Sequence, residues 1–413
     1  MKNITTRFLP SVLFFTLSLG AVLFSACMES AQAQWVPIAS LGAGPTDGCF
    51  SFTLHGKGYV GGGSNGGSFY EYDTLANTWT LKGDAPGDKI RGFGFSFVIN
   101  GKGYAGCGDT TGNNNSTADL WMYNDTTNTW TQGASFPGGG RDAMLCFAIG
   151  DTAYIGGGFD ASGDEWNDFY KYVPATNTWT ALSALPTGIG FPASFVINNK
   201  GYLATGVVSA EVQSLWEYDP ATDTWTAKAS FPGTARQAAF GFSLDNDYGY
   251  VGGGMAGYEV VYNDMWRYDP TADSWATVQS FPSSYPAWSC AFTMGNTAFV
   301  GTGTYFDTTT ETLFGTDSFK KYYGVAAPAT TGIHKINASA SISVYPNPVN
   351  DYLYITGSIA PGAVISIFDM EGREIRTYTD IPSSLYVGDL QTGIYIFRCI
   401  STTGTYTEKI IKQ

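Results

Sequence analysis

The chain has 413 residues, a formal net charge of −14 at pH 7 and an aromatic content of 15%. The negative charge excludes a typical nucleic-acid-binding protein, because such binding depends on basic side chains that neutralise phosphates and no basic stripe occurs here. Charged residues make up 14% of the chain and 52 residues are glycine, which is typical of a globular all-β protein and not of a disordered one.

Residues 1–33 have the features of a secretory signal peptide. Lys2 and Arg7 precede an apolar run of 17 residues, from residue 8 to residue 24. This run is short for a helix that crosses a bilayer, which needs about 20 residues. The small residues of Ala31-Gln32-Ala33 suit cleavage after Ala33, so we expect no transmembrane span in the mature chain. An alternative is a lipoprotein site at which Cys27 is lipidated.

From residue 34 to residue 325 the sequence repeats one pattern of four short strands separated by turn residues. Two sets of aromatic residues mark the repeat at intervals of 44 to 51 residues. A period of this length with four strands per unit is typical of β-propeller blades. We expect both sets to lie in the core between blades. The second-strand markers are Tyr59, Tyr104, Tyr154, Tyr202, Tyr250 and Phe299, and the fourth-strand markers are Trp35, Trp79, Trp130, Trp179, Trp225 and Trp275.

The first unit shows the pattern in full, with Gly58-Tyr-Val-Gly-Gly-Gly, Phe69-Tyr-Glu-Tyr-Asp and Asn77-Thr-Trp-Thr. It resembles the kelch repeat, and the resemblance over residues 34–325 implies an all-β, six-bladed kelch-type propeller. Trp35 precedes any first strand, whereas the last unit has no tryptophan of its own. Trp35 to Ala39 are therefore predicted to form the outer strand of the sixth blade, which closes the ring and leaves no exposed edge.

The C-terminal part lacks the repeat and has a different residue pattern. Residues 326–341 read as a linker, and residues 342–413 contain alternating strands that predict a small Ig-like β-sandwich. Tyr345-Pro-Asn-Pro, Asp369-Met-Glu-Gly-Arg, Gly393-Ile-Tyr and the basic-apolar end together resemble the C-terminal sorting domain of the type IX secretion system. An ordinary Ig-like accessory module is the alternative. The resemblance implies a Bacteroidetes-type bacterium, Sec export, recognition of residues 342–413 by the type IX machinery, and release or attachment at the outer surface; cleavage of the domain stays open.

Few residues offer metal or nucleophile chemistry. His55 and His334 are the two histidines of the chain, so we expect no histidine-based metal centre, no catalytic triad and no cofactor. Gly62-Gly-Ser64-Asn-Gly66 matches a nucleophile elbow in letters, but it leads into a loop and not into a helix. The mature chain would retain five cysteines, an odd number that gives no disulfide framework. A bridge between Cys49 and Cys290 is left open, with buried free thiols as the alternative.

One loop of the third unit is rich in carboxylates, with Asp160, Asp164, Glu165 and Asp168. Paired carboxylates can hydrolyse glycosides, but this spacing defines no separation between them. An acidic solvated loop or a weak calcium site is the favoured interpretation. Lys171 stands where an EF-hand-type calcium loop needs a glutamate, so that specific motif fails.

The long, variable loops of the propeller are predicted to lie on one face and to carry the ligand site. Arginines precede the first strand in three units, where the other units have Thr46, Ile189 and Pro286. We expect these arginines to hold an anionic or sugar-like ligand by charge-assisted hydrogen bonds; the alternative is a structural arginine bonded to a loop carbonyl. The candidate ligand-binding residues are Arg91, Arg141, Arg236, Trp166, Tyr258, Tyr262, Trp288 and Tyr305.

The sequence therefore predicts a secreted or surface-attached binding module for a protein or glycan ligand. No catalytic residue is identified. The alternative is a glycan-acting enzyme on the propeller, such as a sugar epimerase, a mutarotase or a glycosidase. A catalytic residue set at the mouth of the ring would distinguish the two classes.

Overall fold

The computed structural model describes residues 34–324 and 343–413, apart from residues 65, 88–90, 111–114, 258, 285, 308–309 and 311 in the first range and 346–347, 357–362, 370–372, 380–383 and 402–403 in the second. The predictions for the signal peptide, with Ala33 and Cys27, and for the linker at 326–341 fall outside these residues. The chain divides into two compact units between residues 326 and 327. The described residues form strands and no helix, so no described segment is a helix that could span a bilayer.

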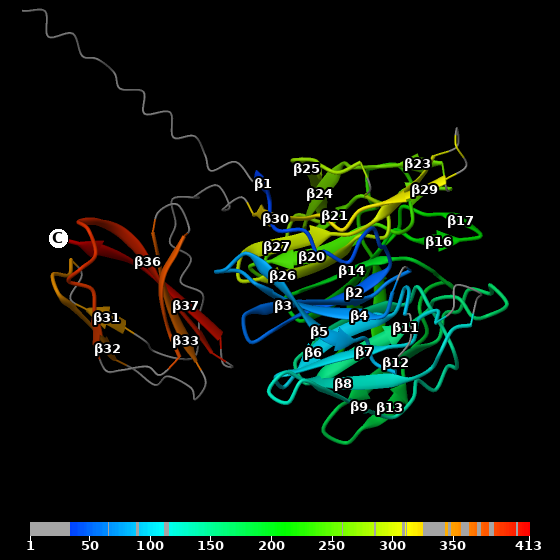
Figure 1. The fold of residues 1–413 in the computed structure, drawn as a ribbon, viewed down its shortest axis with the longest axis horizontal. Helices are drawn as coiled ribbons and strands as arrows, with labels where there is room; N and C mark the ends of the chain where they lie inside the picture. Colours follow the sequence, from blue (N-terminus) through cyan, green and yellow to red (C-terminus); the bar gives the residue numbers. More distant parts are fainter. Residues whose placement is uncertain are drawn as a thin grey trace, which may run out of the picture. The chain divides into compact units, whose positions relative to one another are not determined.

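The described residues of the first unit form six four-stranded antiparallel sheets, as the sequence predicts (Figure 1). We number these blades along the chain. Blade 1 consists of β2 (Cys49–Leu54), β3 (Lys57–Gly62), β4 (Ser68–Asp73) and β5 (Thr78–Asp84). Blade 2 consists of β6 (Phe95–Ile99), β7 (Lys102–Gly106), β8 (Leu120–Asn124) and β9 (Thr129–Gln132). Blade 3 consists of β10 (Leu145–Ile149), β11 (Thr152–Gly156), β12 (Phe169–Val173) and β13 (Thr178–Ala181).

The remaining three blades repeat this order. Blade 4 consists of β14 (Ala193–Ile197), β15 (Lys200–Ala204), β18 (Leu215–Asp219) and β19 (Thr224–Ala227). Blade 5 consists of β20 (Phe240–Leu244), β21 (Tyr248–Gly252), β24 (Met265–Asp269) and β25 (Ser274–Val278). Blade 6 consists of β26 (Cys290–Met294), β27 (Thr297–Gly301), β30 (Phe319–Tyr323) and β1 (Gln34–Pro37).

The N-terminal strand closes the ring. Strand β1 pairs antiparallel with β30, and Trp35 lies opposite Tyr322. The Trp35 ring packs against Phe281 and Tyr322 at centroid distances of 4.8 Å. The first strands of the blades contact one another in sequence order, and β26 returns to β2. The predicted outer strand from Trp35 is therefore confirmed, and it leaves no unpaired edge between the first and last blades.

The repeated aromatic residues build the contacts between blades. The second-strand markers are buried; the tryptophan markers are half-buried, apart from buried Trp35. Several of these indoles donate a hydrogen bond to a backbone carbonyl of the preceding blade, as from Trp179 Nε1 to Ala134 O at 2.9 Å. Two residues earlier, Asn177 adopts a left-handed φ of 51° and accepts hydrogen bonds from Tyr172 Oη (2.8 Å) and Ala134 N (2.8 Å). The Asn-Thr-Trp pattern thus specifies both the turn and the contact with the preceding blade.

The glycine run at the end of each second strand has a conformational cause. Its third residue is glycine in every blade, with φ between 82° and 111° at Gly63, Gly108, Gly158, Gly206, Gly254 and Gly303. L-residues rarely adopt these values. The middle residue has φ between 53° and 69°, which Cys107, Thr205 and Thr302 accept in place of glycine. The runs that look incomplete in sequence therefore keep the one glycine that the turn requires.

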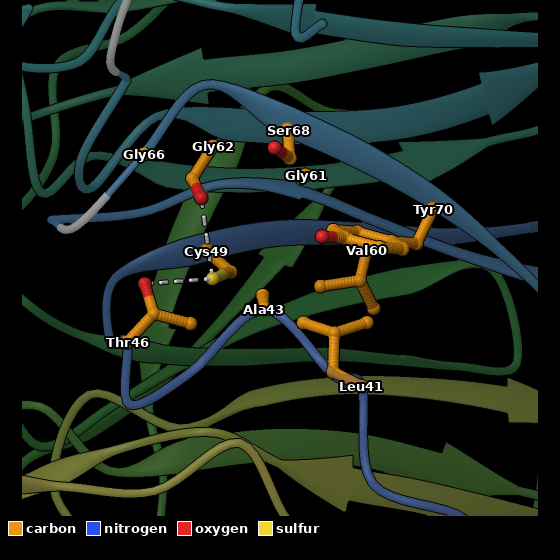
Figure 2. A pocket seen from close by; sticks show the side chains of 10 residues that line it. All are labelled: Leu41, Ala43, Thr46, Cys49, Val60, Gly61, Gly62, Gly66, Ser68 and Tyr70. Atoms are coloured by element: carbon orange, nitrogen blue, oxygen red, sulfur yellow. Dashed lines mark hydrogen bonds between the residues drawn. The ribbon is translucent and has the colours of Figure 1, made fainter. Parts of the chain in front are cut away.

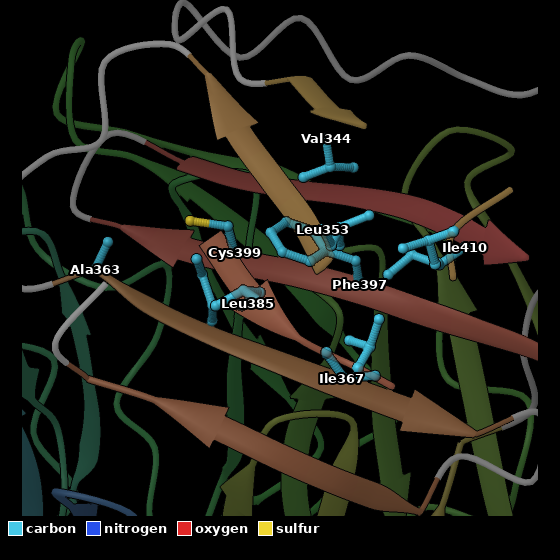
Figure 3. Close-up of a cluster of buried hydrophobic side chains, with 11 residues drawn as sticks. Val344, Leu353, Ala363, Ile367, Leu385, Phe397, Cys399 and Ile410 are labelled. Atoms are coloured by element: carbon cyan, nitrogen blue, oxygen red, sulfur yellow. The ribbon is translucent and has the colours of Figure 1, made fainter. Parts of the chain in front are cut away.

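The second unit is a small β-sandwich, in agreement with the prediction for residues 342–413. One sheet contains β31 (Ser343–Tyr345), β32 (Tyr352–Thr356) and β35 (Ser384–Tyr386). The other contains β34 (Glu374–Tyr378), β33 (Val364–Asp369), β36 (Gly393–Ser401) and β37 (Gly404–Lys412). Leu353 and Leu385 from the first sheet pack with Ile367, Phe397 and Ile410 from the second in a buried core (Figure 3).

Candidate ligand-binding site at the axial mouth

Six residues, one at the start of each innermost strand, form a closed collar around the axis of the ring. These collar residues are Gly48, Phe93, Ala143, Phe191, Ala238 and Trp288, all with φ between 48° and 62°. Each collar N–H donates a hydrogen bond to the collar carbonyl of the preceding blade, at 2.8 to 3.1 Å, and Gly48 N donates to Trp288 O to complete the circle. We call this end of the axis, on the face of the long loops, the axial mouth.

Large and small collar residues alternate around the axis. Phe93, Phe191 and Trp288 come from blades 2, 4 and 6, and glycine or alanine comes from the others. The three rings contact one another at centroid distances of 5.2, 5.6 and 6.0 Å. Phe159, from the long loop of blade 3, extends the cluster at 5.7 Å from Phe191. All four side chains are half-buried, and together we call them the aromatic floor.

Two glycines at the axial mouth are required by the rings beside them: collar residue Gly48, and Gly190, which precedes collar residue Phe191. A Cβ at Gly48 would lie 2.6 Å from the ring of Phe93. A Cβ at Gly190 would lie 1.9 Å from the ring of Phe159. Side-chain size around the axis is therefore set by the packing of the aromatic floor, which fills the axis at this end.

Polar side chains alternate with the floor residues. Asp47, Asp142 and Gln237 precede the three small collar residues, whereas Gly92, Gly190 and Ala287 precede the aromatic ones. Asp142 Oδ2 accepts a hydrogen bond from Ser116 Oγ at 3.0 Å. Burial, aided by the negative charge of Asp109, raises the pKa of Asp142 to about 6. Burial also raises the pKa of Asp47, against the opposing effect of its hydrogen bond with Ser64.

The three predicted arginines lie beneath this surface. Arg91, Arg141 and Arg236 have 0%, 1% and 0% of their surface exposed. Arg141 makes a two-point ion pair with Asp168, at 2.8 and 3.1 Å, and donates to Gly157 O in the glycine turn at 3.1 Å. Arg236 repeats this with Asp264 and Gly253 O, and Arg91 with Asp119 and Cys107 O. Each arginine therefore fastens the glycine turn to the start of the third strand.

We call this arrangement of arginine, aspartate and glycine turn the arginine clamp, and the pKa shifts of its aspartates agree with it. Burial alone would raise the pKa of Asp119, but the hydrogen bond and charge of Arg91 outweigh it and hold the pKa below its usual range. The same balance, with Arg236, lowers the pKa of Asp264. The geometry matches the structural alternative that the sequence left open. Direct contact of these guanidinium groups with a ligand stays a prediction.

A pattern in the sequence could have identified the clamp. In the three blades with arginine, an aspartate directly precedes the third strand. In the other blades, which have Thr46, Ile189 or Pro286 instead of arginine, serine occupies that position. The pairs are Arg91 with Asp119, Arg141 with Asp168 and Arg236 with Asp264, against Thr46 with Ser68, Ile189 with Ser214 and Pro286 with Ser318. Arginine and aspartate thus appear and disappear together.

Two predicted aromatic residues cover the arginines. The guanidinium of Arg141 lies 4.4 Å from the Trp166 ring centroid, and that of Arg236 lies 4.4 Å from the Tyr262 ring centroid. Trp166 is 42% exposed and donates from Nε1 to Asp160 Oδ2 at 2.9 Å. Of the remaining predicted residues, Trp288 lies in the aromatic floor, Tyr258 is outside the described residues, and Tyr305 is described only as backbone in β28 (Thr304–Asp307).

The acidic loop of blade 3 folds around Asp160. Its Oδ1 accepts hydrogen bonds from the backbone N–H groups of Ser162 (2.8 Å) and Asp164 (3.2 Å). Nowhere in the described parts of the chain do three carboxylate, thiol or imidazole groups come close enough to hold a metal ion. These contacts match the interpretation of an acidic solvated loop.

A small cavity lies beside Cys49 in blade 1 (Figure 2). Its volume of about 40 Å³ has room for a few water molecules and not for a sugar. Cys49 Sγ lies 3.6 Å from Gly62 O and 3.8 Å from Thr46 Oγ1. Burial raises the pKa of the Cys49 thiol well above its usual range, which makes it a poor nucleophile. Cys49 and Cys290 are both free thiols in the structure, with no bridge between them.

Comparison with known proteins identifies both units. The profile of the KLHDC2/KLHL20/DRC7 Kelch-repeats domain matches residues 95–303, half of the chain. The chain belongs to the kelch-repeat family. The profile of the secretion system C-terminal sorting domain matches residues 343–413. Both resemblances that were seen in the sequence are thus confirmed, and the sorting domain indicates export by type IX secretion to the cell surface or beyond.

Individual relatives of this kelch protein match over short stretches. N-acetylneuraminate epimerases of Shigella sonnei (strain Ss046) and Escherichia coli (strain K12) are each 39% identical over 83 residues, which is 19% of this chain. The match spans 23% of the length of those relatives. A solved structure described as "Structure of YjhT" aligns with a TM-score of 0.58 and 18% identity, over 68% of this chain and 96% of that one. This likeness shows the propeller fold.

Proposed function

We propose that this protein is a secreted or surface-held binding protein whose kelch propeller takes its ligand on the aromatic floor at the axial mouth. The observation that carries the proposal is the cluster of four half-buried rings, Phe93, Phe159, Phe191 and Trp288, on the face of the long loops. Aromatic side chains dominate binding energy where they are presented together. A Sec signal at residues 1–33 and a Bacteroidetes source belong to the same proposal.

The loops around the floor are braced, which favours binding because little order has to be created when a ligand arrives. The long loops of blades 4, 5 and 6 form the hairpins β16 (Val207–Val208) with β17 (Ala210–Glu211), β22 (Met255–Ala256) with β23 (Val260–Val261), and β28 with β29 (Thr312–Gly315). Labels β16, β17, β23 and β29 lie on the same side of the propeller in Figure 1.

Glutamates tie these hairpins to their neighbours. Glu165 Oε1 accepts a hydrogen bond from Ser209 N at 3.0 Å, which joins the loop of blade 3 to the hairpin of blade 4. Glu211 Oε1 accepts one from Gly257 N at 2.7 Å, which joins the hairpins of blades 4 and 5. The loops therefore form a connected wall beside the aromatic floor.

The test uses Phe191→Ala and Trp288→Ala in the mature full-length chain. Wild-type protein is screened on a glycan array and on an array of extracellular peptides, and each ligand found is then measured against both variants. We expect binding to weaken at least tenfold, because a central aromatic contact is worth about 2 kcal/mol or more. Leu81→Ala is the matched control, since Leu81 is 60% exposed on an outer strand. Unchanged binding by both floor variants would overturn the proposal.

A glycan-acting enzyme is the second candidate, and the partial match to N-acetylneuraminate epimerases favours it. Asp142, with its pKa raised to about 6 by burial, is the described carboxyl at the axial mouth best suited to proton transfer near neutral pH. The assay follows the interconversion of N-acetylneuraminate anomers by NMR. A rate above that of buffer that is lost in Asp142→Asn would support this candidate, and a rate equal to that of buffer would exclude this substrate.

A further inference from the structure

The loops at the axial mouth hold no free positive charge among the residues that the structure describes. Their described cations are Arg91, Arg141, Arg236 and Lys228, and each is ion-paired with a carboxylate. The three arginines are also buried, so their charge is neutralised below the surface. The same loops carry further acids, among them Asp47, Asp109, Asp142, Asp160, Glu165 and Glu211.

Three of these acids belong to segments that touch the aromatic floor, and one of them, Asp47, directly precedes collar residue Gly48, whose carbonyl accepts from Phe93 N at 2.8 Å. Asp142 exchanges two backbone hydrogen bonds with Phe159, at 3.1 and 3.0 Å, and it precedes collar residue Ala143. Asp109 exchanges two backbone hydrogen bonds of 2.8 Å with Gly92, which precedes Phe93. These three acids therefore belong to segments that are hydrogen-bonded to the segments of the aromatic floor.

The aromatic rings also favour a positively charged ligand. The face of an aromatic ring carries partial negative charge, so it attracts a cation and gains more when the cation loses water. A carboxylate or sulfate placed here would meet both the ring faces and the acids, and none of the described cations of these loops is unpaired and able to compensate. Complementarity of charge therefore favours a positively charged partner and disfavours an anionic one.

The shape of the mouth favours a chain over a small enclosed ligand. Small-molecule sites are usually concave and bury most of the ligand. Here the collar of six hydrogen bonds and the contacting rings fill the axis, so a ligand rests on the floor without entering it. An extended segment can place one side chain on such a floor and contact the surrounding loops with the rest.

We propose that the aromatic floor binds a basic peptide segment of a partner protein, with a lysine or arginine side chain over the rings and its charge directed to Asp142 and Asp47. This inference rests on the proposed function and narrows it to one class of partner. It also gives the acidic charge of the mouth a role, because long-range attraction speeds the encounter with a basic partner.

The test measures binding of three blocked heptapeptides to the mature full-length protein by calorimetry. The probe is Gly-Lys-Gly-Lys-Gly-Lys-Gly, and its matched forms replace lysine with norleucine or with glutamate. We expect binding of the lysine peptide, at least tenfold weaker binding of both replacements, and a steady loss of affinity as salt is raised. A chitosan hexamer serves as a separate arm, since it presents ammonium groups on a sugar chain.

The variant pair is Asp47→Asn with Asp142→Asn, against a control pair of Asp151→Asn with Asp245→Asn. Both pairs remove two negative charges, but Asp151 and Asp245 are exposed in hairpins between first and second strands, at the opposite end of the blades. The mouth pair is expected to lose at least tenfold in affinity for the lysine peptide and the control pair less than twofold. Thermal melts of all four proteins check that the fold is retained.

Several results would overturn this inference while leaving the proposed function intact. One is a ligand from the arrays that is neutral or anionic and depends on Trp288, together with no binding of the lysine peptide. Another is tight binding of chitosan alone, which would assign the floor to amino sugars. Equal loss of affinity in both variant pairs would show that binding depends on the net charge of the protein and not on Asp47 and Asp142. If no ligand from the arrays depends on Trp288 for its binding, the proposed function itself would be refuted.

Discussion

The replacement Arg141→Ala is expected to destabilise the propeller by about 3 kcal/mol. Arg141 is 1% exposed and Asp168 24% exposed on the side chain, so the variant leaves a largely buried carboxylate without its partner. Removing one member of a buried ion pair typically costs about 3–5 kcal/mol. The lower end applies because water reaches part of Asp168. The carbonyl of Gly157 also loses its hydrogen bond from the guanidinium.

The chain offers its own compensating substitution. Blade 4 has Ile189 and Ser214 where blade 3 has Arg141 and Asp168, and it forms the same four-stranded sheet. The double variant Arg141→Ile with Asp168→Ser should therefore recover most of the loss, to within about 1 kcal/mol of wild type, because an ion pair replaced by packed neutral residues is often nearly neutral. Arg141→Ile alone should resemble Arg141→Ala.

Urea unfolding followed by tryptophan fluorescence measures these differences. All eleven tryptophans lie between residues 35 and 288, so the signal reports on the propeller and not on the sorting domain. The reasoning would be refuted if Arg141→Ala shifted the unfolding free energy by less than about 0.5 kcal/mol, or if the double variant were no more stable than Arg141→Ile. Loss of ligand binding with unchanged stability would return Arg141 to the predicted ligand-binding role.

Four further predictions follow from the fold. Deleting residues 34–40 removes β1 from β30, so the propeller should melt at lower temperature or form oligomers; an unchanged cooperative melt would contradict the closure. Gly158→Ala should lower the free energy of unfolding in urea more than Gly163→Ala does. Both glycines have φ near 81°, but only a Cβ at residue 158 would lie 2.3 Å from Asp142 O. Equal losses of stability in the two variants would exclude that clash. The stability of Asp142→Asn relative to wild type should increase by roughly 1–3 kcal/mol as pH rises from about 4 to 6, because the raised pKa of Asp142 means that its ionisation disfavours the folded state of the wild type. Thermal melts of both proteins across this range measure the difference, and a difference that does not change with pH would contradict the prediction. Removing residues 342–413 should leave the protein in the periplasm of a host with type IX secretion, and normal appearance in the medium would refute the role of the sorting domain.

The fold could be predicted because its determinants recur in sequence. Trp35 precedes the first unit and the last unit lacks a tryptophan of its own, which predicted the closing strand. The regular spacing of Tyr59 and its counterparts predicted the blades. These signals are local and repeated, since each blade solves the same packing problem. The small sandwich was predicted from alternating strands such as Val364–Asp369 and Gly393–Ser401.

The site was less predictable because it depends on contacts across the axis. Phe93, Phe159 and Phe191 come from three blades and were not singled out as ligand-binding residues; Trp288 was, but not as part of a cluster. No regular spacing connects a loop residue such as Phe159 to a collar residue such as Phe191. The charge of the three arginines suggested an anion site, whereas the aspartates that neutralise them stand 27 or 28 residues later in the chain. The pairing of arginine with aspartate across blades was present in the sequence and would have revealed it.

The claim that the axial mouth is the binding site is tested most directly by hydrogen–deuterium exchange of the full-length protein with and without a ligand found on the arrays. The account predicts slower exchange in segments 92–94, 158–160, 190–192 and 287–289, which contain the aromatic floor. Protection confined to the hairpins between first and second strands, such as residues 55–58 and 198–201, would place the ligand on the opposite face and contradict the account.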